Sequence, residues 1–256
     1  PDETTEKMID AVKLVRNKYN FKGYVHFKVI PGTSYELIKQ ASEFSSRMSV
    51  NLEAPNKSTL DEFSSCKSFK SDILKRQAWI KNMKLPAGQS TQVIVSEHST
   101  DKEIVKMMDW EYEKFKLERF YFSAFQPVKG TEFENLKAQP VSRQNHLYNV
   151  DFLVRKYGYK TKELFSIMDD GMLPNKDPKL ALAIENFDGA IDINEASYED
   201  LIRIPGIGPT TAMRLVKTKI NKMEDFYKFG GHVKRATPFI SINGKRQATI
   251  GDFAKI

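Results

Sequence analysis

The run Pro205-Gly206-Ile207-Gly208-Pro209 constrains this chain more than any other, because it lies between two short segments of helical periodicity. Residues 196–204 predict an amphipathic helix that Pro205 ends, and the two glycines permit a turn that needs positive φ or a bare backbone. Pro209 suits the first turn of a second helix. The sequence therefore predicts a helix, a tight hairpin and a helix. The apolar positions expected in the two helices are Leu201 and Ile204, then Ala212, Leu215 and Val216.

The backbone of this hairpin is suited to holding a phosphate. Where two glycines precede a helix, no Cβ blocks an approaching anion, and the N–H groups of the first turn lack partners within the helix. Such a site binds a phosphate without reading a base. A turn that only packs two helices together is the alternative interpretation. The residues expected at a DNA-binding surface are Gly206, Ile207, Gly208, Thr210, Thr211, Arg214, Lys217, Lys234 and Arg235.

Positive charge is concentrated around the hairpin. Residues 202–247 hold ten Lys and Arg side chains against Glu224 and Asp225, a net charge of +8, whereas the whole chain carries +7. The rest of the chain is thus about neutral. A basic segment next to a phosphate-binding turn is typical of a nucleic-acid footprint.

The first half of the chain alternates between the periodicities of strands and helices. Four expected strands end in turn residues, and helical segments separate them, a pattern that predicts a parallel sheet of the α/β class. Four such units are half of a (β/α) barrel. We therefore expect a partial TIM-type barrel in residues 1–140 and an all-α domain in 141–256, with a helix-hairpin-helix at about 196–219. The strands are expected at 24–30, 48–53, 91–96 and 120–125, and two of the longer helices at 101–115 and 141–157. A short terminal hairpin is expected around Asn243-Gly244, with its two runs at 239–242 and 247–250.

Several motifs, taken together, resemble one known family. The turn matches the helix-hairpin-helix signature of an apolar residue, Pro, Gly, an apolar residue, Gly, a small or polar residue and Ala. In combination with the earlier stretches it resembles the putative DNA modification or repair radical SAM proteins that end in such a domain. The stretches are His26-Phe27-Lys28-Val29-Ile30-Pro31-Gly32, Ser49-Val50-Asn51-Leu52-Glu53, Pro86-Ala87-Gly88-Gln89-Ser90-Thr91-Gln92, Phe120-Tyr121-Phe122-Ser123-Ala124, His146-Leu147-Tyr148-Asn149 and Phe152-Leu153-Val154-Arg155-Lys156-Tyr157-Gly158.

The resemblance implies S-adenosylmethionine and a [4Fe-4S] cluster as cofactors, and a uracil-DNA-glycosylase-like protein as a partner. It also implies that the carboxyl ends of the strands face the cofactor. The chain departs from the family at the cluster, because it has no C-x3-C-x2-C motif and its one cysteine is Cys66. We expect the cluster segment to precede Pro1; loss of the chemistry is the alternative.

Polar side chains near the predicted strands are candidates for a cofactor pocket. Each also has a structural interpretation, as a solvated side chain or a helix cap. Glu97 and His98 alone do not complete a metal site, so no metal ligands are predicted, and Cys66 is expected to be a small buried residue. No catalytic residue is identified. The candidates for cofactor binding are Lys28, Glu53, Gln89 and Glu97.

Composition narrows the function further. No apolar run approaches the length of a membrane span, and the acidic start is unlike a signal peptide, so a cytoplasmic location is expected. The first hypothesis is a DNA-binding part of a radical SAM enzyme. The alternatives are a non-catalytic DNA-binding scaffold that recruits a partner, and a helical module that binds no DNA.

Overall fold

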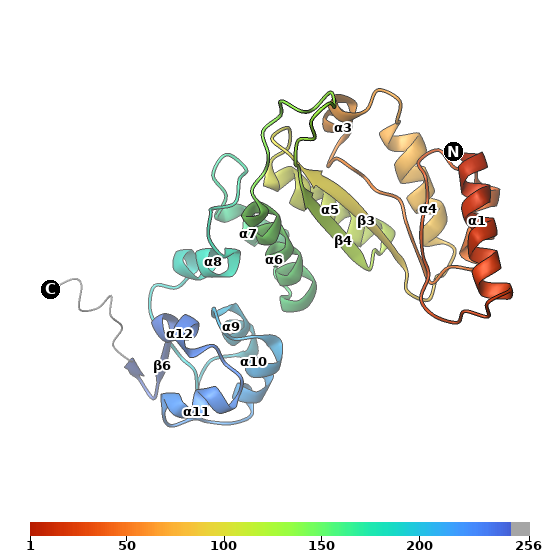
Figure 1. Cartoon of the computed structure of the whole chain (residues 1–256). Helices are drawn as coiled ribbons and strands as arrows, with labels where there is room; N and C mark the ends of the chain where they lie inside the picture. The colour runs from red at the N-terminus through yellow and green to blue at the C-terminus, as the bar shows by residue number, and fades with distance from the viewer. Residues whose placement is uncertain (247–256) are drawn as a thin grey trace. The chain divides into compact units, whose positions relative to one another are not determined.

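The computed structural model describes residues 1–246, and the chain divides between Tyr148 and Asn149 into two compact units (Figure 1). Unit 1 comprises residues 1–148, and unit 2 begins at Asn149. The division lies inside helix α6 (Val141–Tyr157), whose first half belongs to unit 1 and whose second half belongs to unit 2. None of the described helices is both long enough and apolar enough to cross a membrane.

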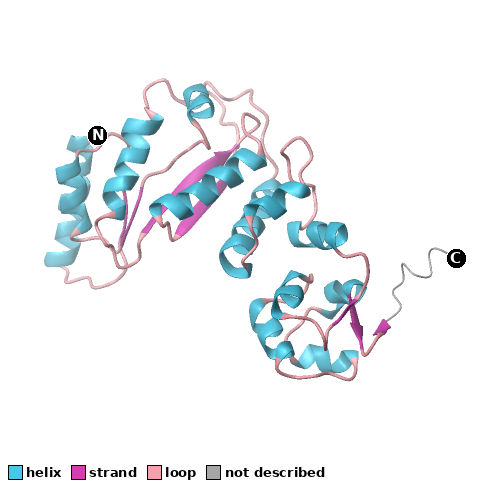
Figure 2. Ribbon diagram, turned by 180° about the vertical axis from the view of Figure 1, so that it is seen from behind, coloured by secondary structure: helices cyan, strands magenta, loops and turns pink. Residues whose placement is uncertain are grey.

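Unit 1 is built on a four-stranded parallel sheet, drawn in magenta in Figure 2. The strand order β1-β2-β3-β4 follows the order of the sequence, and every neighbouring pair is parallel. The prediction of an α/β unit with a parallel sheet is therefore confirmed. The strands are β1 (His26–Lys28), β2 (Arg47–Ser49), β3 (Gln89–Val95) and β4 (Arg119–Ala124).

The helices of unit 1 pack side by side. Helix α1 contacts α2, α2 contacts α4, and α4 contacts α5, so that they form one row. Helix α5 begins at a capping box, in which the Thr100 hydroxyl accepts from the N–H of Glu103 and the Glu103 carboxylate accepts from the N–H of Thr100. The elements are α1 (Asp2–Asn17), α2 (Tyr35–Ser42), α3 (Lys57–Phe63), a π-helical turn (Phe69–Leu74), α4 (Lys75–Lys81) and α5 (Asp101–Phe115).

The two faces of this sheet differ in chemistry. Residues paired in a parallel ladder point to the same side, so the register separates two sets of side chains. The set that includes Phe27, Met48 and Val93 is buried and apolar. The other set is mostly polar, although it also contains Ile94, and several of its members are exposed. It includes His26, Lys28, Arg47, Ser49, Ser90, Gln92, Arg119 and Tyr121.

Unit 2 consists of short helices with a small sheet. That sheet has the order β5-β6-β7, with β5 parallel and β7 antiparallel to β6, so the expectation of an all-α second domain is wrong. The elements after α6 are α7 (Thr161–Ser166), α8 (Pro178–Asn186), β5 (Ile191–Asp192), α9 (Tyr198–Arg203), α10 (Pro209–Val216), α11 (Met223–Lys228), α12 (Val233–Ala236), a 3-10 turn (Thr237–Phe239), β6 (Ile240–Ile242) and β7 (Lys245–Arg246).

A hairpin is present around Asn243 and Gly244, where β6 meets β7, and β7 begins two residues earlier than the predicted second run. Its second run was predicted at 247–250, which lies outside the described residues. Strand β5 was not predicted because two residues are too few to show a period of two.

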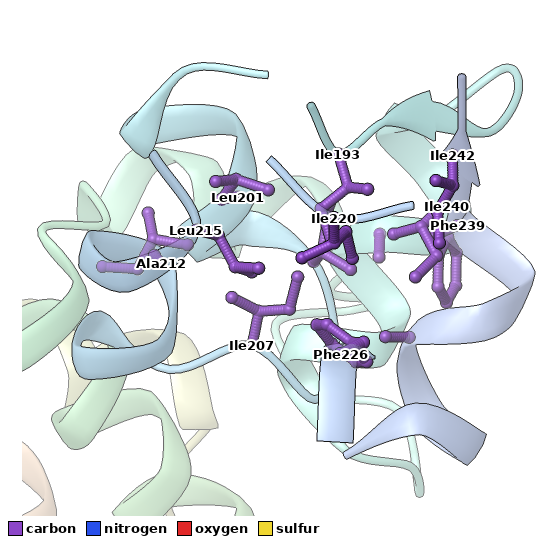
Figure 3. Packing of buried hydrophobic residues seen from close by; sticks show 14 residues of the cluster. Ile193, Leu201, Ile207, Ala212, Leu215, Ile220, Phe226, Phe239, Ile240 and Ile242 are labelled. Atoms are coloured by element: carbon purple, nitrogen blue, oxygen red, sulfur yellow. The ribbon is translucent and has the colours of Figure 1, made fainter. Parts of the chain in front are cut away.

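One apolar cluster holds unit 2 together (Figure 3). The hairpin contributes to it directly, because Ile207 is 1% exposed and lies among side chains of both flanking helices. Val216 was predicted to be an apolar contact of the second helix, but it is 53% exposed. Helix α10 packs against the cluster through Ala212 and Leu215. Because each residue of an α-helix is rotated by about 100° from the one before it, Val216 points away from the side that carries Leu215.

Candidate functional site

The turn between α9 and α10 is fixed at both ends by local hydrogen bonds. Helix α9 begins at a capping box between Ser197 and Asp200, and Ile204 leaves the helix in extended conformation. The N–H of Ile207 then donates to the carbonyl oxygen of Ile204 over 3.1 Å. The turn is therefore a defined structure at the surface of the apolar cluster.

Gly206 occupies a position that only glycine suits. Its φ is +85°, and a Cβ at this position would lie 2.5 Å from the carbonyl oxygen of His232. The N–H of His232 in turn donates to the carbonyl oxygen of Gly206 over 2.9 Å. The segment before α12 thus packs closely against the turn, and Gly206 is required for this close contact.

Gly208 has a different surrounding. It is the N-cap of α10 with φ −100° and ψ 173°, and its carbonyl oxygen accepts the first helical bond from Ala212 over 2.8 Å. A Cβ built on Gly208 meets only the Tyr157 hydroxyl, at 3.4 Å. The N–H groups of Thr210 and Thr211 precede that first bond, so they have no acceptor within the helix. The missing side chain at Gly208 leaves the start of α10 accessible.

A pocket of about 370 Å³ adjoins the turn. Its wall includes backbone of Gly206 and Gly208 and charged side chains from two other elements. It combines bare backbone with convergent polar groups, the composition expected of a ligand site. The lining residues are Asn149, Phe152, Leu153, Tyr157, Asp177, Lys179, Pro205, Gly206, Ile207, Gly208, Thr211, Gly230, His232 and Arg235.

Lys179 is the most unusual side chain in this pocket. Its Nζ donates to the backbone carbonyl oxygen of Ile207 over 2.6 Å and lies 4.5 Å from the centroid of the Tyr157 ring. Burial and the nearby Arg235 lower the pKa of Lys179 to about 7, although Asp177 acts in the opposite direction. A substantial fraction of this amine is therefore uncharged near neutral pH.

Two further side chains complete the polar wall. Asp177 caps α8 by accepting from the N–H of Leu180, and its other oxygen pairs with Arg235 over 3.2 Å. Burial, followed by the charge of Asp177, raises the pKa of the Tyr157 hydroxyl. Tyr157 therefore keeps its proton at neutral pH and is available as a donor.

The structure brings together only part of the predicted DNA-binding set. Gly206, Ile207, Gly208, Thr211 and Arg235 line the pocket. The Ile207 side chain is buried in the cluster, and the Thr211 hydroxyl donates to the carbonyl oxygen of Phe229 over 3.2 Å. The exposed predicted residues outside the pocket lining are Thr210, Arg214, Lys217 and Lys234.

Four residues that line this pocket were not predicted from the sequence to belong to a site, namely Lys179, Tyr157, Asp177 and His232. Lys179 carried a signal, because a lysine in the first turn of a helix opposes the helix dipole. A cation in such a place needs another partner, and the Ile207 carbonyl is that partner. The other three become neighbours only through the tertiary fold.

Ion pairs neutralise part of the basic segment. Four of its cations pair with carboxylates, namely Arg203 with Glu163, Lys219 with Glu195, Lys228 with Asp225 and Arg235 with Asp177. Five others form no ion pair with any residue that the structure describes, which leaves their charge uncompensated at the surface. They are Arg214, Lys217, Lys222, Lys234 and Lys245.

The predicted cofactor residues of unit 1 do not gather at one place. Lys28 pairs with Ser49 of β2, and Ser49 pairs with Ser90 of β3. Glu53 instead pairs with Val93, which lies three residues, or about 10 Å, beyond Ser90 along β3. Glu97 follows the end of β3 and accepts from the N–H of Lys137 over 3.4 Å. The four candidates therefore occupy two levels of the sheet.

Gln89 lies at the amino end of β3, which starts two residues earlier than predicted. It is 3% exposed, on the apolar face, and its Nε2 donates to the carbonyl oxygen of Gln77 over 3.1 Å. Lys28 is exposed on the opposite face. The expectation that Gln89 and Lys28 share a pocket at the carboxyl ends of the strands is therefore wrong.

The described residues do not form a metal or cluster site. Cys66 is exposed, which corrects the expectation of a buried thiol, and its Sγ lies 3.4 Å from the Ser64 hydroxyl. His98 pairs through Nδ1 with Glu62 over 2.6 Å and not with Glu97. Within residues 1–246 no three His, Cys, Asp or Glu side chains are placed to hold a metal ion.

Comparison of the chain with protein-family models, with curated proteins and with solved structures finds no match. A function for this chain is therefore inferred from the geometry of its site.

Proposed function

We propose that this chain is a DNA-binding protein that holds backbone phosphates at the turn between α9 and α10, in the manner of a helix-hairpin-helix. The observation that carries the proposal is the environment of Gly208. It caps an eight-residue helix and has no side chain, and a Cβ added there would meet only the Tyr157 hydroxyl. The first-turn N–H groups of Thr210 and Thr211 have no acceptor within that helix. A phosphate accepts hydrogen bonds from such groups and is favoured by the positive end of the helix dipole.

The surrounding charge supports an anionic polymer as the ligand. Arg214 in the last turn of α10 and Lys217 at the C-cap of this helix form no ion pair with the described residues. Their contacts would add to affinity without discriminating between bases, because phosphates are the same at every position. The expected binding is independent of DNA sequence and strongly dependent on salt.

Unit 1 supports a narrower proposal about architecture. Its strand order does not reverse and its helices follow one another in a single row, which is the arrangement of half of a (β/α) barrel. The polar face of the sheet, with His26, Arg47 and Gln92, would then line the barrel interior. The polar character of that face fits a binding surface better than a packed core.

The residues present do not fit the cofactors that the family resemblance implies. An iron-sulfur cluster of that family needs three cysteines, and this chain has only Cys66, which is exposed. We therefore derive no step through a cluster or through S-adenosylmethionine. The proposed activity of this chain is binding.

The direct test is a salt series of binding to a duplex, with Gly208→Val as the variant. A branched side chain at Gly208 would block the approach to the start of α10. We expect at least a tenfold loss of affinity for duplexes of any sequence and a smaller salt dependence. Gly189→Val is the matched control, because Gly189 lies in the same unit with nothing within 4 Å of an added Cβ.

Three results would separate the alternatives. Equal binding by wild type and Gly208→Val would exclude the hairpin as the phosphate site. A loss restricted to one DNA sequence would contradict a backbone-only contact. Absence of binding at low salt would favour a structural role for the helices of unit 2.

A further inference from the structure

Lys179 holds its amine in the pocket without a carboxylate partner among the described residues. Its Nζ contacts the Ile207 carbonyl oxygen at 2.6 Å and the Tyr157 ring, whereas Asp177, two residues earlier, pairs with Arg235. Lysines that bind phosphate by charge alone are usually solvated and protonated. Lys179 is instead partly removed from water, and this burial, together with the nearby charge of Arg235, favours the neutral amine, which is a nucleophile.

The reactivity of a neutral amine indicates which class of ligand the pocket would bind covalently. Its characteristic covalent partner is an aldehyde or ketone, with which it forms an imine and releases water. An intact nucleotide offers no such group, because its C1′ is bonded to the base. A deoxyribose that has lost its base is a hemiacetal in equilibrium with an open-chain aldehyde at C1′. Base-less DNA is thus the form of the proposed ligand with which this amine can react.

The pocket and the hairpin share their wall. Gly206, Ile207 and Gly208 border the same space that Lys179 enters, and a volume of about 370 Å³ lies within the range of small-ligand pockets. A DNA backbone held at the start of α10 therefore brings an adjacent sugar to the mouth of this pocket. This step depends on the proposed function.

We propose that the pocket beside Gly206 and Gly208 accepts the sugar of a base-less nucleotide and that Lys179 forms an imine with its C1′ aldehyde. The lone pair of Nζ attacks C1′, and the carbonyl electrons move to oxygen. A proton passes from nitrogen to that oxygen, and the carbinolamine then loses water as the C1′=Nζ double bond forms. No oxidant or reductant is consumed.

The neighbours of Lys179 set the pH dependence of this step. Asp177 on its own helix favours the charged amine, whereas Arg235 of α12 and burial oppose it. Tyr157 of α6 keeps its proton and is a candidate donor to the leaving oxygen, and His232 faces the same pocket. Reaction at Lys179 should therefore rise through about pH 7, well below the pH at which solvated lysines lose their protons.

The test is reductive trapping on the complete chain. A duplex with one central base-less sugar is incubated with the protein and sodium cyanoborohydride, which converts an imine into a stable secondary amine. The adducts are quantified, and the modified lysine is identified by proteolysis and mass spectrometry. We expect the wild-type adduct at Lys179 and a loss of at least tenfold in Lys179→Gln, whereas Lys176→Gln, at an exposed lysine just before α8, should trap like wild type.

Binding to the intact duplex, measured for the same proteins, separates the two proposals. Wild-type binding together with adducts distributed over exposed lysines would overturn the role of Lys179 and leave the proposed function standing. Failure of the wild type to bind any duplex at low salt would overturn both. Mapping on the wild-type chain keeps the test decisive even if Lys179→Gln folds poorly.

Discussion

The N–H of His232 donates to the carbonyl oxygen of Gly206 over 2.9 Å, so the segment before α12 is tied to the turn between α9 and α10. The two residues lie 26 positions apart in the sequence and are in backbone contact. This contact explains why the two glycines of the turn are not equivalent. The first belongs to the structure of unit 2, and the second lies at the accessible start of α10.

Gly206→Ala should destabilise the fold of unit 2. Alanine at φ +85° is strained, and its Cβ would stand 2.5 Å from the His232 carbonyl oxygen, a backbone atom that cannot move independently. We expect a loss of at least about 2 kcal/mol in the free energy of unfolding, measured by urea titration. Gly208→Ala, with φ −100° and its nearest contact at 3.4 Å, should cost less than about 1 kcal/mol. Equal losses at both positions would contradict the different roles assigned to them.

Arg214→Gln combined with Lys217→Gln should reduce the salt dependence of DNA binding. Arg214 lies on α10, Lys217 is the C-cap of that helix, and both side chains are exposed. Removing two phosphate contacts should lower the slope of log affinity against log salt by about 2. Lys39→Gln with Lys106→Gln removes the same charge from exposed positions of unit 1 and serves as the control. If the control lowers the slope equally, net charge and not the hairpin surface determines binding.

Arg143→Met should destabilise unit 1. The buried guanidinium pairs with Asp101 at 2.8 Å and donates to the carbonyl oxygens of Ser96 and Ser99 at 2.7 and 2.6 Å. Its loss leaves a buried carboxylate without its cation, for which about 3–5 kcal/mol is typical. Urea unfolding at neutral pH should show this decrease. Arg119→Met, at an exposed position of β4, should change stability by less than about 0.5 kcal/mol, and comparable losses would argue against a special role for Arg143.

The sequence predicted long regular elements well. The predicted boundaries of α5 and α6, residues 101–115 and 141–157, agree with the structure. Two signals in the sequence mark α5. Thr100 and Glu103 form a capping box at its start, and apolar residues recur at helical spacing over four turns. The parallel sheet followed from the alternation of strand and helix periods, which depends on many residues.

Features that depend on register or on long-range contacts were not predictable. Glu53 and Lys28 were predicted to share one pocket because both lie near the end of a predicted strand. The register separates them, because Glu53 pairs with Val93 and Lys28 pairs with Ser49. Lys179 meets the Ile207 carbonyl 28 residues later in the chain, and no local pattern encodes that contact. Motifs located the hairpin, whereas tertiary packing decides which side chains share its pocket.

Glu111→Gln should stabilise the protein at neutral and higher pH. Glu111 of α5 is 0% exposed, so its carboxyl group is removed from water. Burial raises its pKa from 4.5 to about 8, and neighbouring Gln77 offsets part of that rise. The folded state therefore binds more protons than the unfolded state between about pH 4.5 and pH 8, so the wild-type free energy of unfolding falls as the pH rises through this window.

Glutamine keeps the shape of the protonated carboxyl and has no charge to bury. The gain in stability of Glu111→Gln over wild type should therefore be small at pH 4.5 and grow to a few kcal/mol by pH 8.5. Urea unfolding at pH 4.5, 6, 7 and 8.5 measures this difference, in which titration of all other groups cancels. Glu113→Gln, exposed on the same helix, should show no such growth. A gain that does not change with pH would mean that the buried Glu111 carboxyl does not titrate in this window.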